Sequence, residues 1–569
     1  MYYSEFVNLY ETLANTTKRL EKATILSEFL KKLKKEGKSQ WVYLLRGKTF
    51  PDYDPREFGI SDKSVIKAIA KASGIKEEEI MKRYKKIGDL GELAEEFMAK
   101  KKQSTLFSSK LSTEKVYENL RKLVEIEGKG SIEKKLSLIS ELLNSASGKE
   151  AKYIARTLLN DLRIGVAEGV IRDALAEAFF KNEKEMIEKI ETAYDLANDY
   201  AVVFDAAAKG KKDLDKISIT PGRPMKVMLP IKVNDINEAF RICGKPAAIE
   251  HKYDGFRVLI NKDEKGEITL ITRRLENVTK QFPDIVETIE KHVKAKSFIL
   301  DTEAVGFDPA TKKSLPFEAI SQRIKRKYDI DKLIKKLPVE INVFDVIYCN
   351  NKILTNCPFI ERRKILEKII QTEKYKIRPS MQFVTDNEEK AIKFYKQALA
   401  SGEEGIMIKK LDAPYHVGRR VGYIVKIKPD VADLDLVIVG AEYGSGKRAG
   451  WLTSFVVACR SEDKFLEIGK VSSGLKEKEE EGTSYKEMSK LLKPLVIEEK
   501  GKEVKLKPKI VVSVTYQNIQ ESPSYSSGFA LRFPRITHYR PDRKPFDIAT
   551  LKNIENELRR IKSNQNSIR

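Results

Sequence analysis

The stretch PAAIEHKYDGFR, residues 246–257, holds the densest group of chemically suggestive residues in the chain. An apolar run leads to Lys252, and the turn dipeptide Asp254-Gly255 follows two residues later. A lysine at the end of a strand is a nucleophile when its amine is unprotonated, and burial or neighbouring cations favour that form. The alternative is a surface lysine in an ordinary hairpin, because Lys-x-Asp-Gly alone is a weak signal.

Strand and helix patterns alternate in the residues that follow. FRVLINKDEKGEITLITRR (256–274) predicts a hairpin that turns near Gly266, and ERRKILEKIIQTEK (361–374) predicts a helix. Three further segments predict strands: FILDTEAVGFD (298–308), EINVFDVIYC (340–349) and EGIMIKKL (404–411). This mixture predicts an α+β domain over residues 221–430.

Several side chains of this region are candidates for chemistry. Asp301 and Glu303 share one face of an apolar strand, and Glu404 opens another strand. A carboxylate in such a strand needs a cation or a metal as partner, and a plain salt bridge is the simplest choice. Phe344 is either a core residue or a stacking face for a base. In VKIK, Lys426 and Lys428 face the same side of a strand.

Residues 1–220 have helical patterning. ETLANTTKRLEKATILSEFLKKLKKEG (11–37) predicts one helix that ends at Gly37, and AKYIARTLLNDL (151–162) and GVIRDALAEAFF (169–180) predict two more. The polar stretch 100–113 is expected to divide the helical part into two sub-bundles. Prolines and a glycine in ITPGRPMKVMLP (219–230) predict a linker.

After residue 430 the pattern becomes mostly short strands with glycine turns, which predicts a small β-barrel over residues 431–569. The lysine-rich stretch 475–507 is expected to be a solvated helix and loop, and TLKNIENELRRIKS a terminal helix. The basic segment LRFPRITHYRPDRKP (531–545) is either a solvated tail or a placed segment in which Arg532 and Arg535 bind phosphates.

Composition narrows the functional class. The 569 residues carry a net charge of +23, which favours a polyanionic partner such as nucleic acid, although a Lys- and Glu-rich thermophilic surface is an alternative. The four cysteines form no CxxC pair and the four histidines have no metal-ligand spacing, which disfavours a disulfide framework and a zinc hydrolase. No apolar run spans a bilayer and the N-terminus is no secretory signal, so we expect a cytoplasmic protein without membrane association.

Taken together and in order, the motifs resemble those of ATP-dependent DNA ligases of the archaeal and eukaryotic replicative type. The resemblance extends over nearly the whole chain. It rests on these stretches: KYDGFR (252–257), TRRLENVT (272–279), ILDTEAV (299–305), VFDV (343–346), EGIMIK (404–409), VKIK (425–428), RFPRI (532–536), NDLRIGVAEGVIRDALA (160–176), GRPMKVMLP (222–230) and GAEYGSGKRAGWLTSFVVAC (440–459).

The resemblance implies three domains: an all-α DNA-binding domain (1–220), an α+β adenylation domain (221–430) and an all-β OB-fold domain (431–569). It implies an enzyme of replication, repair and recombination that uses ATP and Mg²⁺ to seal nicks in double-stranded DNA. Lys252 becomes adenylated, AMP passes to the 5′-phosphate, and the 3′-hydroxyl then displaces AMP. Members of the family generally act as monomers.

The same resemblance assigns roles to individual residues. Lys252 is the nucleophile, and Glu404, with Glu303 second, is the candidate metal ligand. The remaining nucleotide contacts are Glu250 to the adenine, Arg257 and Arg273 to the ribose and phosphates, Glu303 to the ribose hydroxyl, Phe344 stacked on the base, Arg420, Lys426 and Lys428 at the phosphates, and Arg532 and Arg535 at the pyrophosphate.

The chain departs from the family pattern at a few places. Ile424 stands where tryptophan is frequent, His538 where arginine is common, and Glu318 where glutamine is usual. QSTLF (103–107) has part of the spacing of a sliding-clamp (PCNA) peptide but lacks its paired aromatics, so a bare linker is the alternative. RNA ligases and capping guanylyltransferases share the lysine chemistry, and a non-catalytic DNA-binding paralogue is the non-enzymatic alternative.

Overall fold

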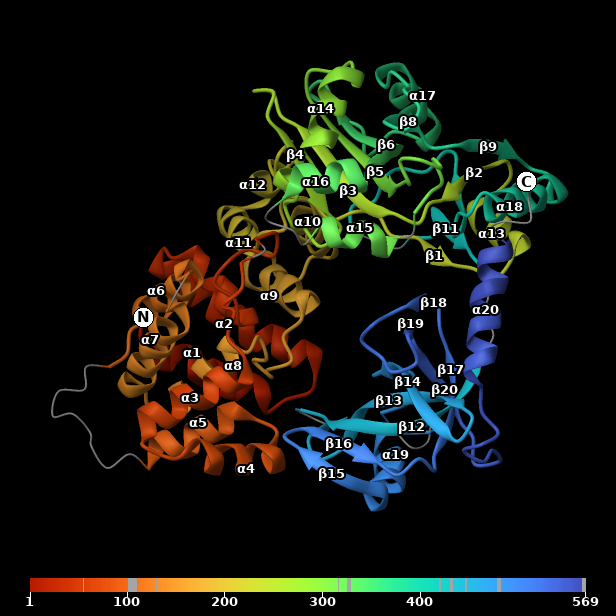
Figure 1. The fold of residues 1–569 in the computed structure, drawn as a ribbon. Helices are drawn as coiled ribbons and strands as arrows, with labels where there is room; N and C mark the ends of the chain where they lie inside the picture. The colour runs from red at the N-terminus through yellow and green to blue at the C-terminus, as the bar shows by residue number, and fades with distance from the viewer. Residues whose placement is uncertain are drawn as a thin grey trace. The chain divides into compact units, whose positions relative to one another are not determined.

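The computed structural model describes the chain apart from residues 55, 101–109, 129, 316, 325–328, 419–420, 430–432, 446–447, 478–482 and 565–569, and apart from the side chains of 318 and 560–564. The chain forms two compact units, one of residues 1–59, 111–127 and 160–429 and the other of residues 60–110, 128–159 and 430–569. The ribbon is shown in Figure 1. These units do not follow the division at residues 220 and 430, which stays a prediction.

The N-terminal part is helical, as predicted. The helices of this N-terminal part that belong to the first unit are α1 (Tyr3–Ala14), α2 (Arg19–Glu36), η1 (Ser39–Arg46), α6 (Thr113–Glu125), α9 (Glu168–Phe180), α10 (Lys184–Ala197), α11 (Tyr200–Lys209) and α12 (Lys211–Asp215). The N-terminal helices that belong to the second unit are α3 (Asp62–Ser73), α4 (Glu77–Ile87), α5 (Leu90–Ala99), α7 (Ser131–Ser145) and α8 (Gly148–Leu158).

Two predictions about these helices are wrong. The single helix over 11–37 is two helices, because the Thr16 hydroxyl accepts a hydrogen bond from the Lys18 amide (3.2 Å) and donates one to Glu21 (2.7 Å), which competes with a continuous helix. The stretch 100–113 does not separate two sub-bundles, because α5 packs on α8 and α3 on α7 across it. Gly91 of α5 makes this approach possible, since a Cβ there would lie 2.7 Å from Cγ of Arg156.

The central part contains two sheets with helices around them, which confirms the predicted α+β class. Its strands are β1 (Ile231–Lys232), β2 (Ala247–Lys252), β3 (Phe256–Lys262), β4 (Ile268–Thr272), β5 (Phe298–Gly306), β6 (Val339–Cys349), β7 (Lys352–Ile353), β8 (Ile377–Pro379), β9 (Gln382–Thr385), β10 (Gly405–Lys410) and β11 (Ile424–Ile427). Its helices are α13 (Ile236–Cys243), η2 (Thr279–Gln281), α14 (Pro283–His292), α15 (Phe317–Ile324), α16 (Ile330–Lys336), α17 (Phe359–Ile369) and α18 (Glu388–Ala400).

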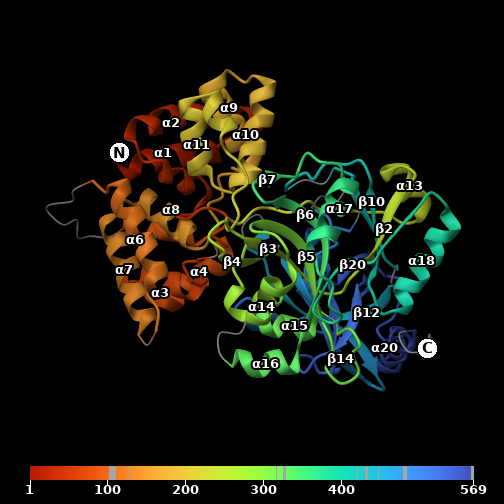
Figure 2. The same cartoon turned by 90° about the horizontal axis from the view of Figure 1, so that it is seen from above.

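The five-stranded sheet has the order β1-β11-β10-β2-β9. One face is apolar and packs against α13 and α18, which lie beside β2 and β10 in Figure 2. Side chains of Ile249, Ile406, Ile408, Val425 and Ile427 are buried there. Because successive strand residues point to opposite faces, the intervening residues are all directed to the other side of the sheet.

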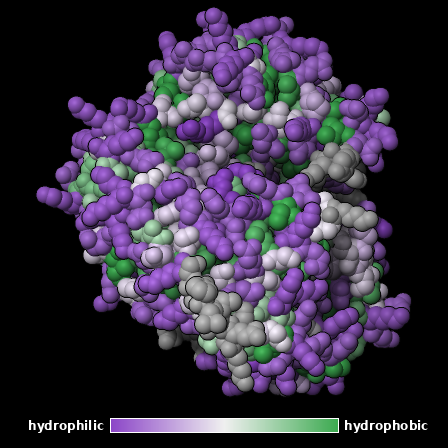
Figure 3. Space-filling view, turned by 90° about the vertical axis from the view of Figure 1, so that its left-hand side faces the viewer, coloured by the Kyte–Doolittle hydropathy of each residue, from purple (hydrophilic) through white to green (hydrophobic). Residues whose placement is uncertain are grey.

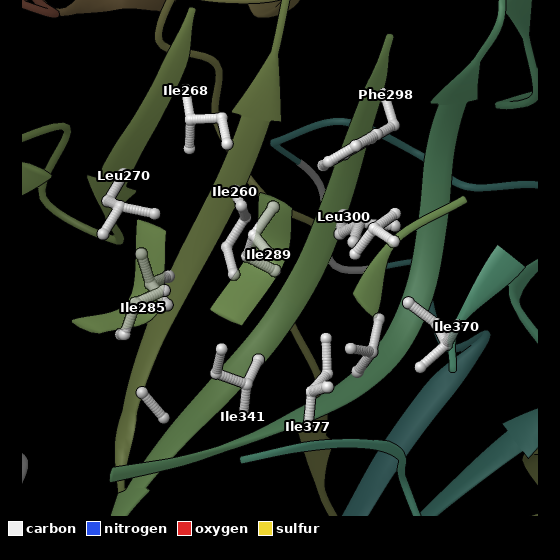
Figure 4. Close-up of a cluster of buried hydrophobic side chains, with 14 of the residues drawn as sticks. Ile260, Ile268, Leu270, Ile285, Ile289, Phe298, Leu300, Ile341, Ile370 and Ile377 are labelled. Atoms are coloured by element: carbon white, nitrogen blue, oxygen red, sulfur yellow. The ribbon is translucent and has the colours of Figure 1, made fainter. Parts of the chain in front are cut away.

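The six-stranded sheet has the order β4-β3-β5-β6-β7, with β8 added beside β6. The predicted hairpin is confirmed, with Gly266 in the left-handed region at φ +88°. The outer face packs on α14 and its neighbours through the apolar cluster of Figure 4. Ile260, Leu270 and Leu300 of the strands meet Ile285 and Ile289 of α14 in that cluster.

The predicted linker 219–230 is not a free connection. Met225, Val227 and Met228 are buried in a cluster with Leu259 and Ile299 from the inner face of the six-stranded sheet. Ile424, the residue at the frequent tryptophan position, is buried in the same cluster. The segment therefore closes one end of the space bounded by the two sheets.

The C-terminal part is rich in strands, which confirms the predicted β class. Its elements are β12 (Leu434–Tyr443), β13 (Leu452–Ser461), β14 (Lys464–Val471), α19 (Tyr485–Leu492), η5 (Lys493–Leu495), β15 (Val496–Lys500), β16 (Glu503–Leu506), β17 (Val511–Thr515), β18 (Asn518–Glu521), β19 (Phe529–Arg532), β20 (Arg535–Tyr539) and α20 (Leu551–Asn564). The long strand β12 pairs with β13 on one side and with β16 and β17 on the other.

The prediction of a solvated helix and loop over 475–507 is wrong in part. Tyr485, Met488 and Leu492 of α19 are buried, and so are Val504 and Leu506 of the β15–β16 hairpin. The lysines of this stretch alternate with apolar residues that fill the core of the C-terminal part. High lysine content therefore hid an amphipathic pattern.

The molecular surface in the view of Figure 3 is mostly hydrophilic, with hydrophobic residues in small separate spots. Among the described residues, no helix combines the length and the apolarity that crossing a bilayer requires.

Candidate functional site

Lys252 is the last residue of β2 and lies beside the start of β10. Its Nζ forms an ion pair with Oε2 of Glu404, and the Glu404 amide donates to the Lys252 carbonyl (2.9 Å). Gly405 is paired with Lys252 in the register and has φ +150°. A Cβ at this position would collide with the Ile427 carbonyl oxygen, so only glycine lets the three strands meet here.

The Asp254-Gly255 turn brings this strand end against the other sheet. A Cβ at Gly255 would collide with the Ala304 carbonyl and lie 3.1 Å from Cγ of Glu303. The turn therefore runs in close contact with β5 because residue 255 has no side chain. This contact places Lys252 near Glu303, and the positive charge of the lysine acts to lower the pKa of the Glu303 carboxyl.

The inner face of the five-stranded sheet is cationic. Met407 is paired with Glu250 on one side and with Lys426 on the other, so the three side chains share that face. Lys428 follows two residues after Lys426 and continues the same alternation. Burial and the nearby charges of Lys252 and Lys428 lower the pKa of Lys426. Crowded cations of this kind suit a ligand with several phosphate charges.

Glu250 is a buried carboxylate held on both oxygens. Gln382 donates from Nε2 to Oε1 (2.9 Å), and Nζ of Lys409 lies 2.8 Å from Oε2. Arg363 is farther away, with Nη1 3.9 Å from Oε1. The carboxylate is therefore fixed in position and orientation before any ligand binds.

The inner face of the six-stranded sheet carries Arg257. Its Nε and Nη2 donate to both oxygens of Asp301 (2.8 and 2.5 Å), and its Nη1 donates to the Met228 carbonyl (2.9 Å). Tyr415 donates to the same carboxylate (2.6 Å) and accepts from the Met228 amide (3.1 Å). Burial acts to lower the pKa of Arg257, but the Asp301 carboxylate outweighs it and the pKa is raised. Of the two predicted partners for Asp301, a cation or a metal, the structure therefore shows the simpler one, a salt bridge to Arg257.

Glu303 pairs with Arg257 in the register of β3 and β5. Burial raises the pKa of its carboxyl to about 8, against the opposing effects of Lys252 and Arg257. Glu404 and Asp301 add like charge nearby. The neighbouring carboxylates of Glu303 and Glu404, close to the cations of the sheet, suit a divalent cation. Over the described residues, no group of three or more His, Cys, Asp or Glu side chains converges as a metal cage.

Phe344 is half-buried in β6, and cations approach its ring from both sheets. The guanidinium of Arg257 lies 5.1 Å from the ring centroid and Nζ of Lys409 lies 4.8 Å from it. Lys409 also donates to the Phe344 carbonyl (3.1 Å). The ring belongs to the same space as Glu250, because one ammonium group contacts both residues.

Four predicted site residues remain. Arg273 is exposed directly after β4, and its charge is among those that lower the pKa of Lys426. Arg532 ends β19 half-buried and Arg535 opens β20 exposed, both in the second compact unit. Arg420 lies outside the described residues, as does the side chain of Glu318, and His538 is exposed on β20.

Family models cover most of the chain. The model "ATP dependent DNA ligase domain" matches residues 227–428, "DNA ligase N terminus" matches residues 2–176, and "ATP dependent DNA ligase C terminal region" matches residues 448–543. The DNA ligase of Nanoarchaeum equitans is 46% identical over 561 residues and covers 98% of each chain. The chain belongs to the ATP-dependent DNA ligase family.

Other relatives of this ligase agree. The DNA ligase of Thermococcus fumicolans is 42% identical over 557 residues, which cover 97% of this chain and 98% of that one. The solved structure "Pmar-Lig_Pre." has a TM-score of 0.58 at 19% identity and covers 94% of this chain and 99% of that chain, so it supports the fold. The protein is therefore an enzyme, a DNA ligase that uses ATP.

Sequence reasoning missed three side chains that the ligase brings into the pocket. Gln382 and Lys409 hold Glu250, and Tyr415 holds Asp301. The alternation in EGIMIKKL contained a signal for Lys409, since residues 405, 407 and 409 share a face. No comparable signal existed for Gln382 or Tyr415, which reach the pocket through sheet pairing and a loop.

Proposed function

We propose that the protein seals nicks in double-stranded DNA with Lys252 as the adenylated nucleophile. The observation that carries this proposal is the position of Lys252. It stands at the end of β2, paired with Glu404 and sharing one face with Lys426 and Lys428. A nucleophile at the edge of a cationic face is the arrangement that attack on a nucleotide phosphate requires.

Three steps follow from this arrangement. The unprotonated amine of Lys252 attacks the α-phosphorus of ATP, a P–N bond forms, and pyrophosphate leaves. The 5′-phosphate of the nick then attacks the same phosphorus and releases the lysine with AMP on the DNA. Finally the 3′-hydroxyl attacks the 5′-phosphorus, the phosphodiester forms, and AMP leaves. Lys426 and Lys428 offset the phosphate charge in the first two steps.

In this proposal Glu250 reads the adenine, Phe344 stacks on it and Glu303 binds the ribose hydroxyl. Arg257 and Arg273 contact the ribose and phosphates, and Arg420 contacts the phosphates. Arg532 and Arg535 orient the pyrophosphate. Asp301 binds Arg257 through two hydrogen bonds, which leaves the guanidinium little freedom to move. This supports a fixed position of Arg257 beside the Phe344 ring.

We also propose that Glu404 and Glu303 bind Mg²⁺. Magnesium in nucleotide sites is held by one or two carboxylates together with substrate phosphates and water, so a complete protein cage is not required. When bound, the ion supplies positive charge that stabilises the phosphate charge developing in the transition state. The residues present fit this role, since both carboxylates border the same cationic pocket.

Self-adenylation tests the nucleophile. The protein is incubated with α-labelled ATP and magnesium without DNA, and covalent label is followed on a denaturing gel. Wild type should become labelled and Lys252→Ala should not, while Lys265→Ala in the exposed β3–β4 turn should label as wild type. Labelling of Lys252→Ala would move the nucleophile to another lysine and contradict the proposed pocket.

Nicked duplex DNA is the proposed substrate, bound through its phosphates by a monomer. With a net charge of +23, binding should release counterions, so affinity should fall by about 10³-fold between 50 and 200 mM salt if about six phosphates are contacted. The measurement is binding to a nicked duplex at a series of salt concentrations. A flat plot of log K against log salt would exclude phosphate-dominated binding.

A sliding clamp is a second proposed partner, through residues 103–107, which lie outside the described residues. Only part of the expected peptide pattern supports it. Deletion of 103–107 should abolish binding to the clamp and leave self-adenylation unchanged. If the deletion variant bound the clamp as well as wild type does, residues 103–107 would be a linker and not a clamp-binding peptide.

A further inference from the structure

Lys409 is a buried cation that the three proposed reaction steps do not use. Its side chain is 3% exposed, and the carboxylate that it contacts, Glu250, is 2% exposed. A lysine is rarely buried to this degree without a partner, because removing an ammonium group from water is costly. Its position therefore requires an explanation beyond stability.

The ammonium group of Lys409 links the two sheets. From β10 its Nζ lies 2.8 Å from Oε2 of Glu250 on β2, and it donates to the carbonyl of Phe344 on β6 (3.1 Å). The ring of Phe344 lies 4.8 Å from the same atom. One cation thus sets the spacing between a carboxylate on one sheet and an aromatic residue on the other.

The second oxygen of Glu250 is fixed independently. Gln382 on β9 donates a hydrogen bond to Oε1 (2.9 Å). Arg363 of α17 also lies near this oxygen, but it donates its hydrogen bonds to Glu367 and Ser380. Donors therefore lie at both oxygens of Glu250, and a carboxylate held in this way presents only acceptors to a ligand.

A fixed acceptor beside an aromatic face discriminates between purines. The exocyclic amine of adenine donates a hydrogen bond, whereas guanine presents its O6 acceptor at the same edge. Two acceptors facing each other in a buried pocket leave both unsatisfied, which is costly.

We propose that Lys409 is a specificity-determining positioning residue, which holds Glu250 as an anionic acceptor at a fixed distance from Phe344 so that the pocket takes adenine and rejects guanine. Lys409 acts through Glu250 and does not touch the reacting atoms. The proposal rests on the proposed function, because it takes Glu250 and Phe344 as the groups that bind the base.

The test compares covalent labelling of the protein by α-labelled ATP and GTP, with the maximal single-turnover labelling rate and the half-saturating nucleotide concentration, here called KM, measured for each. Lys409→Met keeps an unbranched side chain of similar length and removes the charge. The buried carboxylate left unpaired then takes up a proton, and a protonated carboxyl donates to guanine O6. The preference for ATP over GTP should fall about ten-fold or more, chiefly through a higher KM for ATP and a lower KM for GTP.

Lys410→Met is the matched control. Lys410 is the next residue of β10, faces the opposite side and pairs with Asp412 at 3.6 Å, so its loss should leave the preference unchanged. A double-mutant cycle adds Glu250→Gln. If Lys409 acts through Glu250, Lys409→Met should change the preference much less in that background.

A folded Lys409→Met protein with the wild-type preference, or an equal change in Lys410→Met, would overturn the proposal. If Lys409→Met does not fold, Gln382→Met decides, because it frees the other oxygen and should lower the preference about three-fold; no change there would count against the proposal. A wild type that ATP does not label would instead refute the proposed function, and the two failures are thereby distinguished.

Discussion

The two faces of the five-stranded sheet come from the same strands but have opposite chemistry. On one face Ile249, Ile406 and Ile427 are buried against α13 and α18, while Glu250, Lys252 and Lys426 are directed to the other. Neighbouring residues of a strand thus belong either to the core or to the pocket. The pocket can carry crowded, unfavourable charge because the opposite face supplies apolar burial.

This contrast predicts that adjacent substitutions separate activity from stability. Lys426→Met should lower self-adenylation about 100-fold because phosphate stabilisation is lost, with unfolding little changed because burial and Lys252 already lower the pKa of this lysine. Ile427→Ala should cost about 2–4 kcal/mol of stability, while the folded protein keeps its adenylation activity. Labelling rates and thermal unfolding of both variants check this. Similar losses of activity and stability in both variants would refute the division between the faces.

Substitution of Gly405 tests the close approach of β10 to β2 and β11 beside Lys252. Gly405→Ala should cost about 2–3 kcal/mol and reduce self-adenylation, because the new Cβ collides with the Ile427 carbonyl and displaces β10 from Lys252. Gly402→Ala is the control, since φ is +85° but nothing lies within 4 Å of the added Cβ. It should cost only about 1 kcal/mol. Equal effects on chemical unfolding would mean that backbone conformation, and not crowding, sets the requirement for Gly405.

The smallest expected effect concerns His251, which lies between Glu250 and Lys252 but faces the core. Burial, with a contribution from Arg378, lowers its pKa from 6.5 to about 4, and it contacts the rings of Tyr253 and Phe394. At pH values between about 4 and 6.5, His251 binds a proton in the unfolded chain but not in the folded chain. The free energy of unfolding therefore falls as the pH falls through this range. This group should account for about 2 kcal/mol of the loss between pH 7 and pH 5.

His251→Phe should remove that part of the pH dependence and leave adenylation at pH 7 unchanged. Urea unfolding at the two pH values measures it, with His538→Phe on exposed β20 as the control. A variant as pH-sensitive as wild type would mean that His251 is protonated in the folded protein and does not belong to the apolar face.

The strands of the central part were predictable because their signals are local. Apolar alternation located β3, β5, β6 and β10, and Gly266 marked the turn between β3 and β4. The interruption of the first long helix was missed, because hydrophobic spacing alone does not detect the local hydrogen bonds of Thr16 to the Lys18 amide and to Glu21. The packing of α5 on α8 was missed for another reason, since it joins segments far apart in the chain.

The sequence by itself determined the family and the α-then-α+β-then-β order of the chain, and it predicted Lys252 as the nucleophile, because motif spacing and strand alternation are properties of neighbouring residues. Only the tertiary structure decided the partners of those residues. Lys409 and Gln382 contact Glu250, Asp301 contacts Arg257, and Tyr415 contacts Met228. These contacts join residues that are 44 to 187 positions apart in the chain. Such contacts depend on the order of strands in the sheets and on the need of each buried charge for a partner, and neighbouring residues in the sequence specify neither.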